Sequence, residues 1–121
     1  NAIEAPDRGF LFYARVGARL VGYGRLDRGR DDANALGVVA LTVLEAYRRK
    51  GIGEALMRAL LRGAASSGLQ EVWLSVRPDN TPAVRLYEKL GFVRDTSRPL
   101  GRWAVPGEMT MAWLPRVADL S

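Results

Sequence analysis

The sequence predicts an α/β fold in which two helices pack on a mixed β-sheet, and three observations lead to this class. An apolar run over Leu36–Leu44 is followed by a glycine-containing turn, an amphipathic helix and another apolar run, the order of a parallel βαβ unit. Short runs rich in aromatic and β-branched residues flank this unit, as expected of antiparallel strands. The length of 121 residues, 48% of them hydrophobic, is enough for one core, and we expect a single domain over residues 1–121.

Composition limits the chemistry that the chain can perform. The sequence has no Cys and no His, which excludes disulfides and a thiol nucleophile and removes the commonest metal ligand, so we expect no metal. The net charge is +5, but the basic residues are scattered rather than arranged as a stripe, so we expect no nucleic-acid partner. No apolar run is long enough to span a membrane and the start does not resemble a signal peptide, so we expect a cytoplasmic protein with no membrane partner.

The first quarter of the chain predicts a polar lead-in and a hairpin. Residues 1–9 are polar and contain a proline, which indicates a loose lead-in. Phe10–Val16 and Arg19–Leu26 read as antiparallel strands, because Gly17 and Ala18 form a two-residue turn between them. The charged stretch Asp27–Asn34 that follows is predicted to be an exposed loop.

The middle of the chain predicts the βαβ unit. The strand Leu36–Leu44 is almost continuously apolar, which indicates burial on both faces. A helix over Ile52–Ser67 is expected to end at Gly68, and a parallel strand Glu71–Val76 follows it. The predicted buried stripe of the helix consists of Ile52, Leu56, Ala59, Leu60 and Ala64.

The last third predicts a second helix and two more strands. Arg77–Asn80 reads as a turn, with Thr81 as N-cap and Pro82 as the first helical residue. The helix buries Ala83, Leu86, Tyr87 and Leu90 and ends at Gly91. Beyond it we expect a strand from Phe92–Val93, a loop over Arg94–Gly107 and a final strand over Met109–Leu114.

The turn after the central strand has the features of an anion site. Its pattern is Arg48-x-x-Gly51-x-Gly53, with Arg49 and Lys50 between, and it stands where a helix begins. The first N–H groups of a helix have no partner within the helix and lie at the positive end of its dipole, while glycines let a phosphate approach the backbone. The pattern is neither a P-loop nor a dinucleotide fingerprint, because it lacks the lysine-serine/threonine ending and the third glycine.

A second pattern, Asn80-x-x-Ala83-x-x-x-Tyr87-x-x-x-Gly91-Phe92, follows at a distance of one helix and one strand. Together the two segments closely resemble the acyl-CoA site of the GNAT superfamily of N-acetyltransferases and cover about half of the chain, Leu36 to Val93. The resemblance implies that the two parallel strands splay apart and that the pantetheine arm of acetyl-CoA lies between them.

The resemblance also implies which residues do what. The chain would transfer an acetyl group from acetyl-CoA to a primary amine in a ternary complex, with Tyr87 as the acid that protonates the leaving thiolate and a backbone N–H near Val43 polarising the carbonyl. No general base is assigned, although Glu45, Asp31 and Asp32 could act through water. The residues expected to bind acetyl-CoA are Leu41, Thr42, Val43, Arg48, Arg49, Lys50, Gly51, Ile52, Gly53, Glu54, Asn80, Ala83 and Tyr87.

Two alternatives follow from the start of the chain and from the packing of single residues. The family usually has a strand and two helices before the hairpin, but only nine residues precede Phe10, so we expect those elements to be absent. A homodimer or another segment would then cover the sheet, or the chain would be a non-catalytic acyl-CoA-binding or interaction domain. Packing alone would also account for Tyr87, and a turn cap for Asn80.

Overall fold

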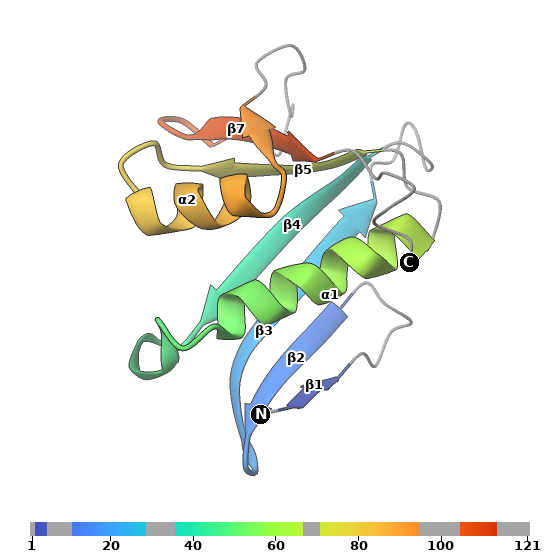
Figure 1. Ribbon diagram of the computed structural model, residues 1–121, viewed down its shortest axis with the longest axis vertical. Helices are drawn as coiled ribbons and strands as arrows, with labels where there is room; N and C mark the ends of the chain where they lie inside the picture. Colours follow the sequence, from blue (N-terminus) through green and yellow to red (C-terminus); the bar gives the residue numbers. More distant parts are fainter. Residues whose placement is uncertain (1, 5–10, 29–35, 67–70, 95–104, 114–121) are drawn as a thin grey trace.

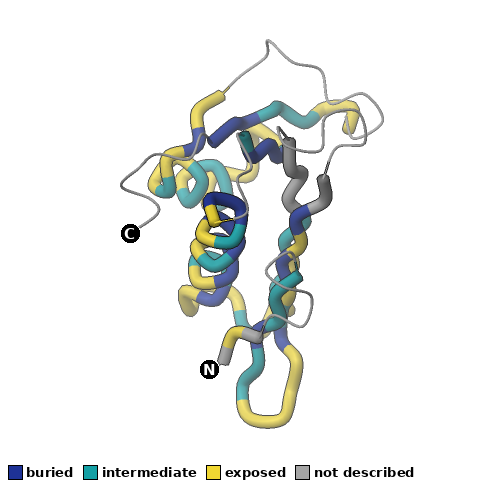
Figure 2. The backbone as a smooth tube through the Cα atoms, turned by 90° about the vertical axis from the view of Figure 1, so that its right-hand side faces the viewer, coloured by how far each residue is buried: buried dark blue, intermediate teal, exposed yellow. Residues whose placement is uncertain are grey.

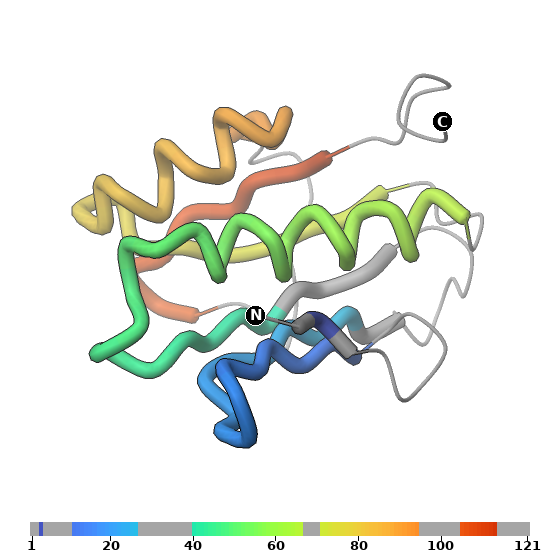
Figure 3. The backbone as a smooth tube through the Cα atoms, turned by 60° about the horizontal axis from the view of Figure 1, so that its bottom comes forward, coloured from blue at the N-terminus to red at the C-terminus, as the bar shows by residue number. Residues whose placement is uncertain are grey.

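The computed structural model describes residues 2–4, 11–28, 36–66, 71–94 and 105–113. They form a seven-stranded mixed sheet in the order β1-β2-β3-β4-β5-β7-β6, with both α-helices on one face (Figures 1 and 3). The predicted fold class is therefore confirmed. The strands are β1 Ala2–Glu4, β2 Leu11–Val16, β3 Arg19–Arg28, β4 Leu36–Val43, β5 Glu71–Val76, β6 Val93–Arg94 and β7 Met109–Trp113. The helices are α1 Ile52–Ser66, α2 Thr81–Lys89 and the short 3₁₀ helix η1 Glu45–Tyr47.

The N-terminal part of the sheet is longer than the sequence predicted. Residues expected to be a loose lead-in include β1, which pairs antiparallel with β2 through Ile3 and Ala14. A strand therefore does precede the hairpin, contrary to expectation. Three residues carry too weak a pattern to predict a strand, and the pairing edge of β2 supplies the missing stabilisation. Likewise Asp27 and Arg28 belong to β3 rather than to a loop, because they pair with β4 residues.

The hairpin between β2 and β3 was predicted correctly. Its turn contains Gly17 at a φ of 60°, a left-handed conformation that glycine adopts without strain. The pairing register shifts between Ala14 and Arg15, which marks a β-bulge in β2.

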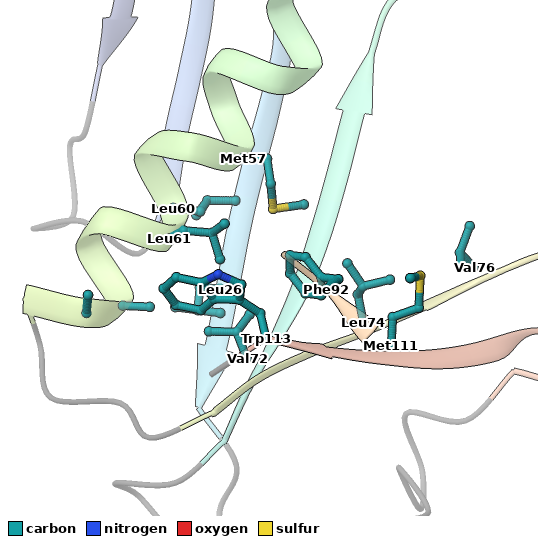
Figure 4. Close-up of a cluster of buried hydrophobic side chains, with 12 residues drawn as sticks. Leu26, Met57, Leu60, Leu61, Val72, Leu74, Val76, Phe92, Met111 and Trp113 are labelled. Carbon is teal, nitrogen blue, oxygen red and sulfur yellow. The ribbon is translucent and has the colours of Figure 1, made fainter. Parts of the chain in front are cut away.

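The core lies between the sheet and the two helices. Figure 4 shows Val72 and Leu74 of β5 and Met111 and Trp113 of β7 on the side of the sheet that faces α1. From the helix come Met57, Leu60 and Leu61, so α1 buries a wider face than the predicted stripe, of which Ala59 is only half-buried. Each fully buried side chain of this size contributes about 1.5–3 kcal/mol to folding.

Two glycines of β3 let α1 and β4 come close. A Cβ atom at Gly24 would lie 2.8 Å from Cδ1 of Leu60, and one at Gly22 would lie 2.8 Å from the carbonyl oxygen of Thr42. Side chains at these positions would force the helix or the neighbouring strand to move.

The prediction that the central strand is buried on both faces is wrong for the C-terminal part of β4. Ala40, Leu41 and Val43 are half-buried, and Thr42 and Leu44 are exposed. The reason is that the helices cover a single face of this strand, as Figure 2 shows by the exposed residues along the strands beside α1. An apolar run does not by itself distinguish one covered face from two.

The second helix begins one residue earlier than predicted. Its N-cap is Asn80, whose Oδ1 accepts a hydrogen bond from the backbone N–H of Ala83 at 3.4 Å, so the prediction of Thr81 as cap is wrong. Both residue types cap helices, but the non-helical backbone of Asn80, with φ −82° and ψ 72°, leaves Thr81 inside the first turn. The helix ends at Gly91 as expected, where φ is 101°.

The remaining differences lie at element ends. Phe92 is buried beside the core but precedes β6, which consists of Val93 and Arg94, so the predicted strand start at Phe92 and the predicted loop start at Arg94 are both one residue too early. The predicted boundaries at Phe10, Ser67, Gly68 and Leu114 fall outside the described residues. Neither described helix is long and apolar enough to cross a membrane.

Candidate active site

The parallel strands β4 and β5 pair only where they begin. Their register joins Leu36 to Glu71, Gly37 to Val72 and Val38 to Trp73, and no pair follows. From there β4 continues to Val43 along β3, while β5 continues to Val76 along β7. Figure 1 shows the two strands meeting at one end and diverging toward the other. The structure thus contains the splayed pair that the resemblance implied.

The diverging edge of β4 carries backbone groups directed away from β3. The N–H of Leu44 donates to the carbonyl of Val21 at 2.8 Å, which makes this a hydrogen-bonded pair of the antiparallel ladder. Because such pairs alternate along a ladder, the N–H and C=O groups of Thr42 face β3, whereas those of Leu41 and Val43 face the side of β5. Of the three residues predicted to offer their backbone, two therefore present it at the open edge and Thr42 does not.

The basic turn after η1 is exposed. Arg48, Arg49 and Lys50 all reach solvent, as an electrostatic contact to a polyanion requires. Arg48 folds back so that its Nε donates to the carbonyl oxygen of Val43 at 3.0 Å, and Lys50 Nζ lies 5.8 Å from the ring centre of Tyr47. The turn is therefore tied to the end of β4 by the side chain of Arg48.

The glycines of this turn are not required by packing. Gly51 has a φ of 80°, and a Cβ atom there would meet nothing within 4 Å. At Gly53 a Cβ atom would make only ordinary contacts of 3.9 Å with Leu41 and Val43. The left-handed backbone explains Gly51, whereas no contact of the described residues explains the missing side chain at Gly53.

The start of α1 offers several N–H groups. The first helical hydrogen bond of α1 runs from the N–H of Ala55 to the carbonyl of Gly51 at 3.0 Å. The N–H groups of Ile52, Gly53 and Glu54 precede that bond and have no acceptor within the helix. They lie at the positive end of a 15-residue helix, beside the exposed cations of the turn.

A carboxylate stands at the same helix start, held by two cations. Glu54 accepts from Arg58 one turn later at 3.0 Å and from Lys89 at the end of α2 at 2.9 Å. The hydrogen bond from Lys89, followed by that from Arg58, lowers the pKa of Glu54. Because Lys89 and Arg58 compensate this charge, the site retains its positive character, and the Glu54–Lys89 pair joins the two helices.

The second segment brings one phenol into the core. Tyr87 of α2 is half-buried, and its ring centre lies 5.8 Å from that of Phe92 with the planes tilted by 57°. Burial raises its pKa, and the negative charge of Glu108 raises it further. The phenol therefore keeps its proton at neutral pH. The other two predicted residues of this segment, Asn80 and Ala83, join in the helix cap, with Asn80 exposed.

The structure adds a carboxylate that the sequence patterns missed. Glu108 precedes β7 and is half-buried, and its Oε1 accepts a hydrogen bond from the hydroxyl of Ser75 at 2.7 Å. Of the carboxylates considered from the sequence, Glu45 is exposed in η1 and Asp31 and Asp32 fall outside the described residues. Only the antiparallel register of β5 and β7 could have indicated Glu108, and a single sequence does not give that register.

In the part of the chain that is described, no group of three or more Asp, Glu, His or Cys residues could hold a metal ion. The arrangement therefore combines an open backbone edge, a helix start beside exposed cations, a protonated phenol and a hydrogen-bonded carboxylate. These parts suit the binding of an extended phosphate-bearing thioester and the movement of protons around it.

Known proteins resemble this chain in sequence and in fold. An N-alpha-acetyltransferase of Sulfurisphaera tokodaii is 41% identical over 92 residues, which make up 68% of this chain and 55% of that protein. A mycothiol acetyltransferase of Corynebacterium efficiens is 43% identical over 76 residues, or 63% of this chain and 25% of that protein. A putative acetyltransferase from Salmonella typhimurium, solved with its cofactor acetyl-CoA, superposes with a TM-score of 0.70 at 20% identity, covering 86% of this chain and 63% of that one.

The chain thus spans about half of the first relative and a quarter of the second. The model of the acetyltransferase (GNAT) family matches residues 1–92. This match includes both segments of the site, from the open edge of β4 to Tyr87, and ends before β7 and Glu108. The resemblance seen in the sequence is confirmed, and the chain belongs to the GNAT family of acetyltransferases.

Proposed function

We propose that this chain is an acetyl-CoA-dependent N-acetyltransferase that passes the acetyl group directly to a primary amine in a ternary complex. The observation that carries the proposal is the open edge of β4 next to the exposed basic turn that leads into α1. Beyond Val38 the strand has no β5 partner, and the backbone groups of Leu41 and Val43 face that side. An extended amide chain can pair with such an edge as an added strand would.

The two ends of acetyl-CoA would meet different parts of this edge. The diphosphate fits the N–H groups of Ile52, Gly53 and Glu54, with Arg48, Arg49 and Lys50 supplying positive charge around it. The pantetheine amides would then pair with the backbone of Leu41, because the carbonyl of Val43 accepts from Arg48 and its N–H is directed toward the thioester. The missing side chain of Gly53, which contacts within the chain do not require, leaves room for the diphosphate to approach the backbone.

The chemical step needs an oxyanion donor and an acid. The N–H of Val43 is directed to the open edge and would stabilise the developing oxyanion of the thioester carbonyl. Tyr87 would donate its proton to the leaving thiolate, for which its raised pKa keeps it in the correct protonation state. The absence of Cys from the sequence favours direct attack over transfer through an acyl-thiol enzyme.

Acetyl-CoA binding and amine acetylation test the proposal in sequence. Acetyl-CoA should raise the melting temperature, because a ligand that binds only the folded state stabilises it by mass action. The protein and acetyl-CoA are then incubated with peptides that have free N-termini, suggested by the N-alpha-acetyltransferase relatives, and with small amines, and products are detected by mass spectrometry. Unchanged melting at millimolar acetyl-CoA would contradict the binding site, and binding without any product would favour a non-catalytic acyl-CoA-binding domain.

A further inference from the structure

We infer that Glu108, held by the hydroxyl of Ser75, accepts the proton of the incoming amine. This inference rests on the proposed acetyltransferase function and assigns the base that the sequence left open. Glu108 lies outside the part of the chain that the family model matches, so the inference depends on this structure rather than on the family.

The sheet register places Glu108 at the carboxyl end of β5. Val76, the last residue of β5, pairs with Met109, the first of β7, and Ser75 pairs with Thr110. Glu108 therefore stands one residue beyond the ladder and, by the alternation of a strand, on the same face as Ser75. This end of β5 is the one that has diverged from β4, so the carboxylate belongs to the splayed end of the sheet.

The hydrogen bonding of Glu108 leaves it able to take up a proton. Its Oε1 is held at 2.7 Å by a neutral hydroxyl, which fixes the carboxylate without neutralising its charge. Arg77 is the cation beside it in the register: its guanidinium binds both carboxylate oxygens of Asp79 at 3.1 and 3.0 Å, and the pKa of Arg77 is raised mainly by Asp79 and also by the charge of Glu108. Within the described ranges no ion pair joins Glu108 to a cation.

Other described carboxylates with known surroundings are less suited to this role. Glu54 and Asp79 are paired with cations, and Glu45 and Glu88 are exposed. Glu71 is also half-buried and accepts from the indole of Trp73, but it begins β5 at the end where β4 and β5 are paired. Position in the sheet therefore separates Glu108 from Glu71.

Glu108 and Tyr87 reach the same region from different elements. The charge of Glu108 contributes to raising the pKa of Tyr87, so the two groups lie within electrostatic reach of each other. The phenol comes from α2 through the core, and the carboxylate comes from the residue before β7, on the opposite face of the sheet. An acid for the leaving sulfur and a base for the attacking nitrogen would thus stand on either side of the reacting carbonyl.

The protons and bonds balance in this scheme. An amine that arrives as ammonium gives one proton to Glu108, which releases it to solvent, and the freed nitrogen forms the N–C bond with the thioester carbonyl. The C–S bond then breaks as Tyr87 protonates the sulfur. The second N–H proton leaves the adduct and restores the phenol through solvent, so acetylated amine, CoA thiol and one proton are the products.

The test compares Glu108→Gln with the parent in kcat/KM for an acetylated amine between pH 6 and 10. Gln keeps the size of the side chain and an acceptor for Ser75, and the expected loss at neutral pH is about 10²–10⁴-fold. The loss should become smaller as pH approaches the pKa of the amine, because the amine then reaches the site already deprotonated by solvent. The affinity for acetyl-CoA should not change. Ser75→Ala, which releases the carboxylate, should give a smaller loss with the same pH trend.

Glu71→Gln is the matched control, because Glu71 of β5 is also a half-buried, hydrogen-bonded carboxylate. This variant should retain the kcat/KM of the parent. Suppose that the parent is active. If kcat/KM of Glu108→Gln is within about threefold of the parent value, or if its loss of kcat/KM is the same at every pH, the role of Glu108 is overturned and the proposed function still stands. A parent that binds acetyl-CoA but acetylates no amine would instead overturn the proposed function, and the base with it.

Discussion

The carboxyl ends of β4 and β5 offer different kinds of chemical group, backbone groups at β4 and side chains at β5. At the end of β4 the groups that face the open edge belong to the backbone, and an exposed turn follows, with Gly51 in the turn and Gly53 in the first turn of α1. At the end of β5 the groups are side chains contributed by three elements, namely Ser75, Tyr87 and Glu108, and all three are half-buried. One side of the proposed site therefore depends on backbone conformation, and the other depends on the identity of a few side chains.

This difference separates binding from chemistry. A hydrogen bond from a backbone N–H survives most substitutions, so affinity for acetyl-CoA should respond mainly to changes in backbone conformation or to added bulk. Proton transfer needs a particular functional group, so turnover should respond to isosteric changes that leave the fold intact. Substitutions at the two ends should thus affect different measured constants.

The largest effect is expected from Gly51→Glu. A side chain at a φ of 80° strains the turn, and its carboxylate would repel the diphosphate at the helix start. We expect the rise in melting temperature with acetyl-CoA to disappear in a thermal-shift titration. Gly107→Glu is the control, because that glycine has a φ of 84° and equally open surroundings but lies in the turn before β7. Loss of acetyl-CoA binding in both variants would show that backbone strain and added charge weaken binding wherever they are introduced, and not only at the helix start.

Tyr87→Phe should affect kcat rather than the affinity for acetyl-CoA. The ring still packs near Phe92 while the proton donor is lost, so kcat should fall by about 10²–10⁴-fold with little change in acetyl-CoA affinity. Steady-state kinetics and a binding titration measure the two separately. The exposed Tyr23, changed to Phe, should turn over like the parent. Equal kcat in the parent and Tyr87→Phe would assign the tyrosine to packing alone.

Gly53→Ala should maintain or raise the stability of the fold but weaken the binding of acetyl-CoA. The new methyl group fits at 3.9 Å from its neighbours and favours the helix, so the free energy of unfolding should stay equal or rise by up to ~1 kcal/mol. The same methyl group would stand where the diphosphate approaches, and Kd for acetyl-CoA should rise about three- to tenfold, or roughly 0.7–1.4 kcal/mol.

Chemical denaturation and calorimetric titration measure the two changes. Gly22→Ala gives the contrasting case, because its Cβ would collide with the backbone of β4 and lower stability by about 1–3 kcal/mol. Unchanged affinity in Gly53→Ala would mean that the diphosphate does not approach this part of the helix.

The smallest expected effect concerns stability in alkali. The pKa of Tyr87 is raised by folding, so the unfolded chain ionises first, near pH ~10. This contribution to stability is fully present below that pH and is lost as pH rises toward the folded pKa. In urea denaturation between about pH 9 and 11, Tyr87→Phe should therefore lose less stability than the parent, and a parallel decline of the two would argue against burial as the cause.

The sequence predicted the elements at the end of β4 better than the side chains at the end of β5. The βαβ unit, the glycine turn and the helix start follow one another in the chain, so local patterns contain all of them. Tyr87 was found because the spacing of its helix resembles the family pattern. Glu108 was missed because it lies 33 residues from Ser75 in the sequence and meets it only through the pairing of β5 with β7.

The errors in the fold have similar causes. The three residues of β1 form a strand through the edge of β2, and β3 runs on through Asp27 and Arg28 because β4 pairs with them. In each case a tertiary partner outweighed a weak local preference. The shift of the cap from Thr81 to Asn80 is different, because two adjacent residues that can both cap a helix differ only in backbone angles.

The insertion of β7 between β5 and β6 has a consequence for synthesis of the protein. Val93–Arg94 pairs with Met109–Trp113, and Glu71–Val76 pairs with the same strand along the edge that does not face β4. Met109–Trp113 leaves the ribosome after both of these partners. Until those five residues emerge, the nascent chain exposes the apolar face of β5 and the buried ring of Phe92 without Met111 and Trp113 to cover them. The sheet is completed at the same late stage at which Glu108 emerges. A ribosome stalled before this strand would therefore hold an intermediate that has the open edge of β4 but lacks the carboxylate.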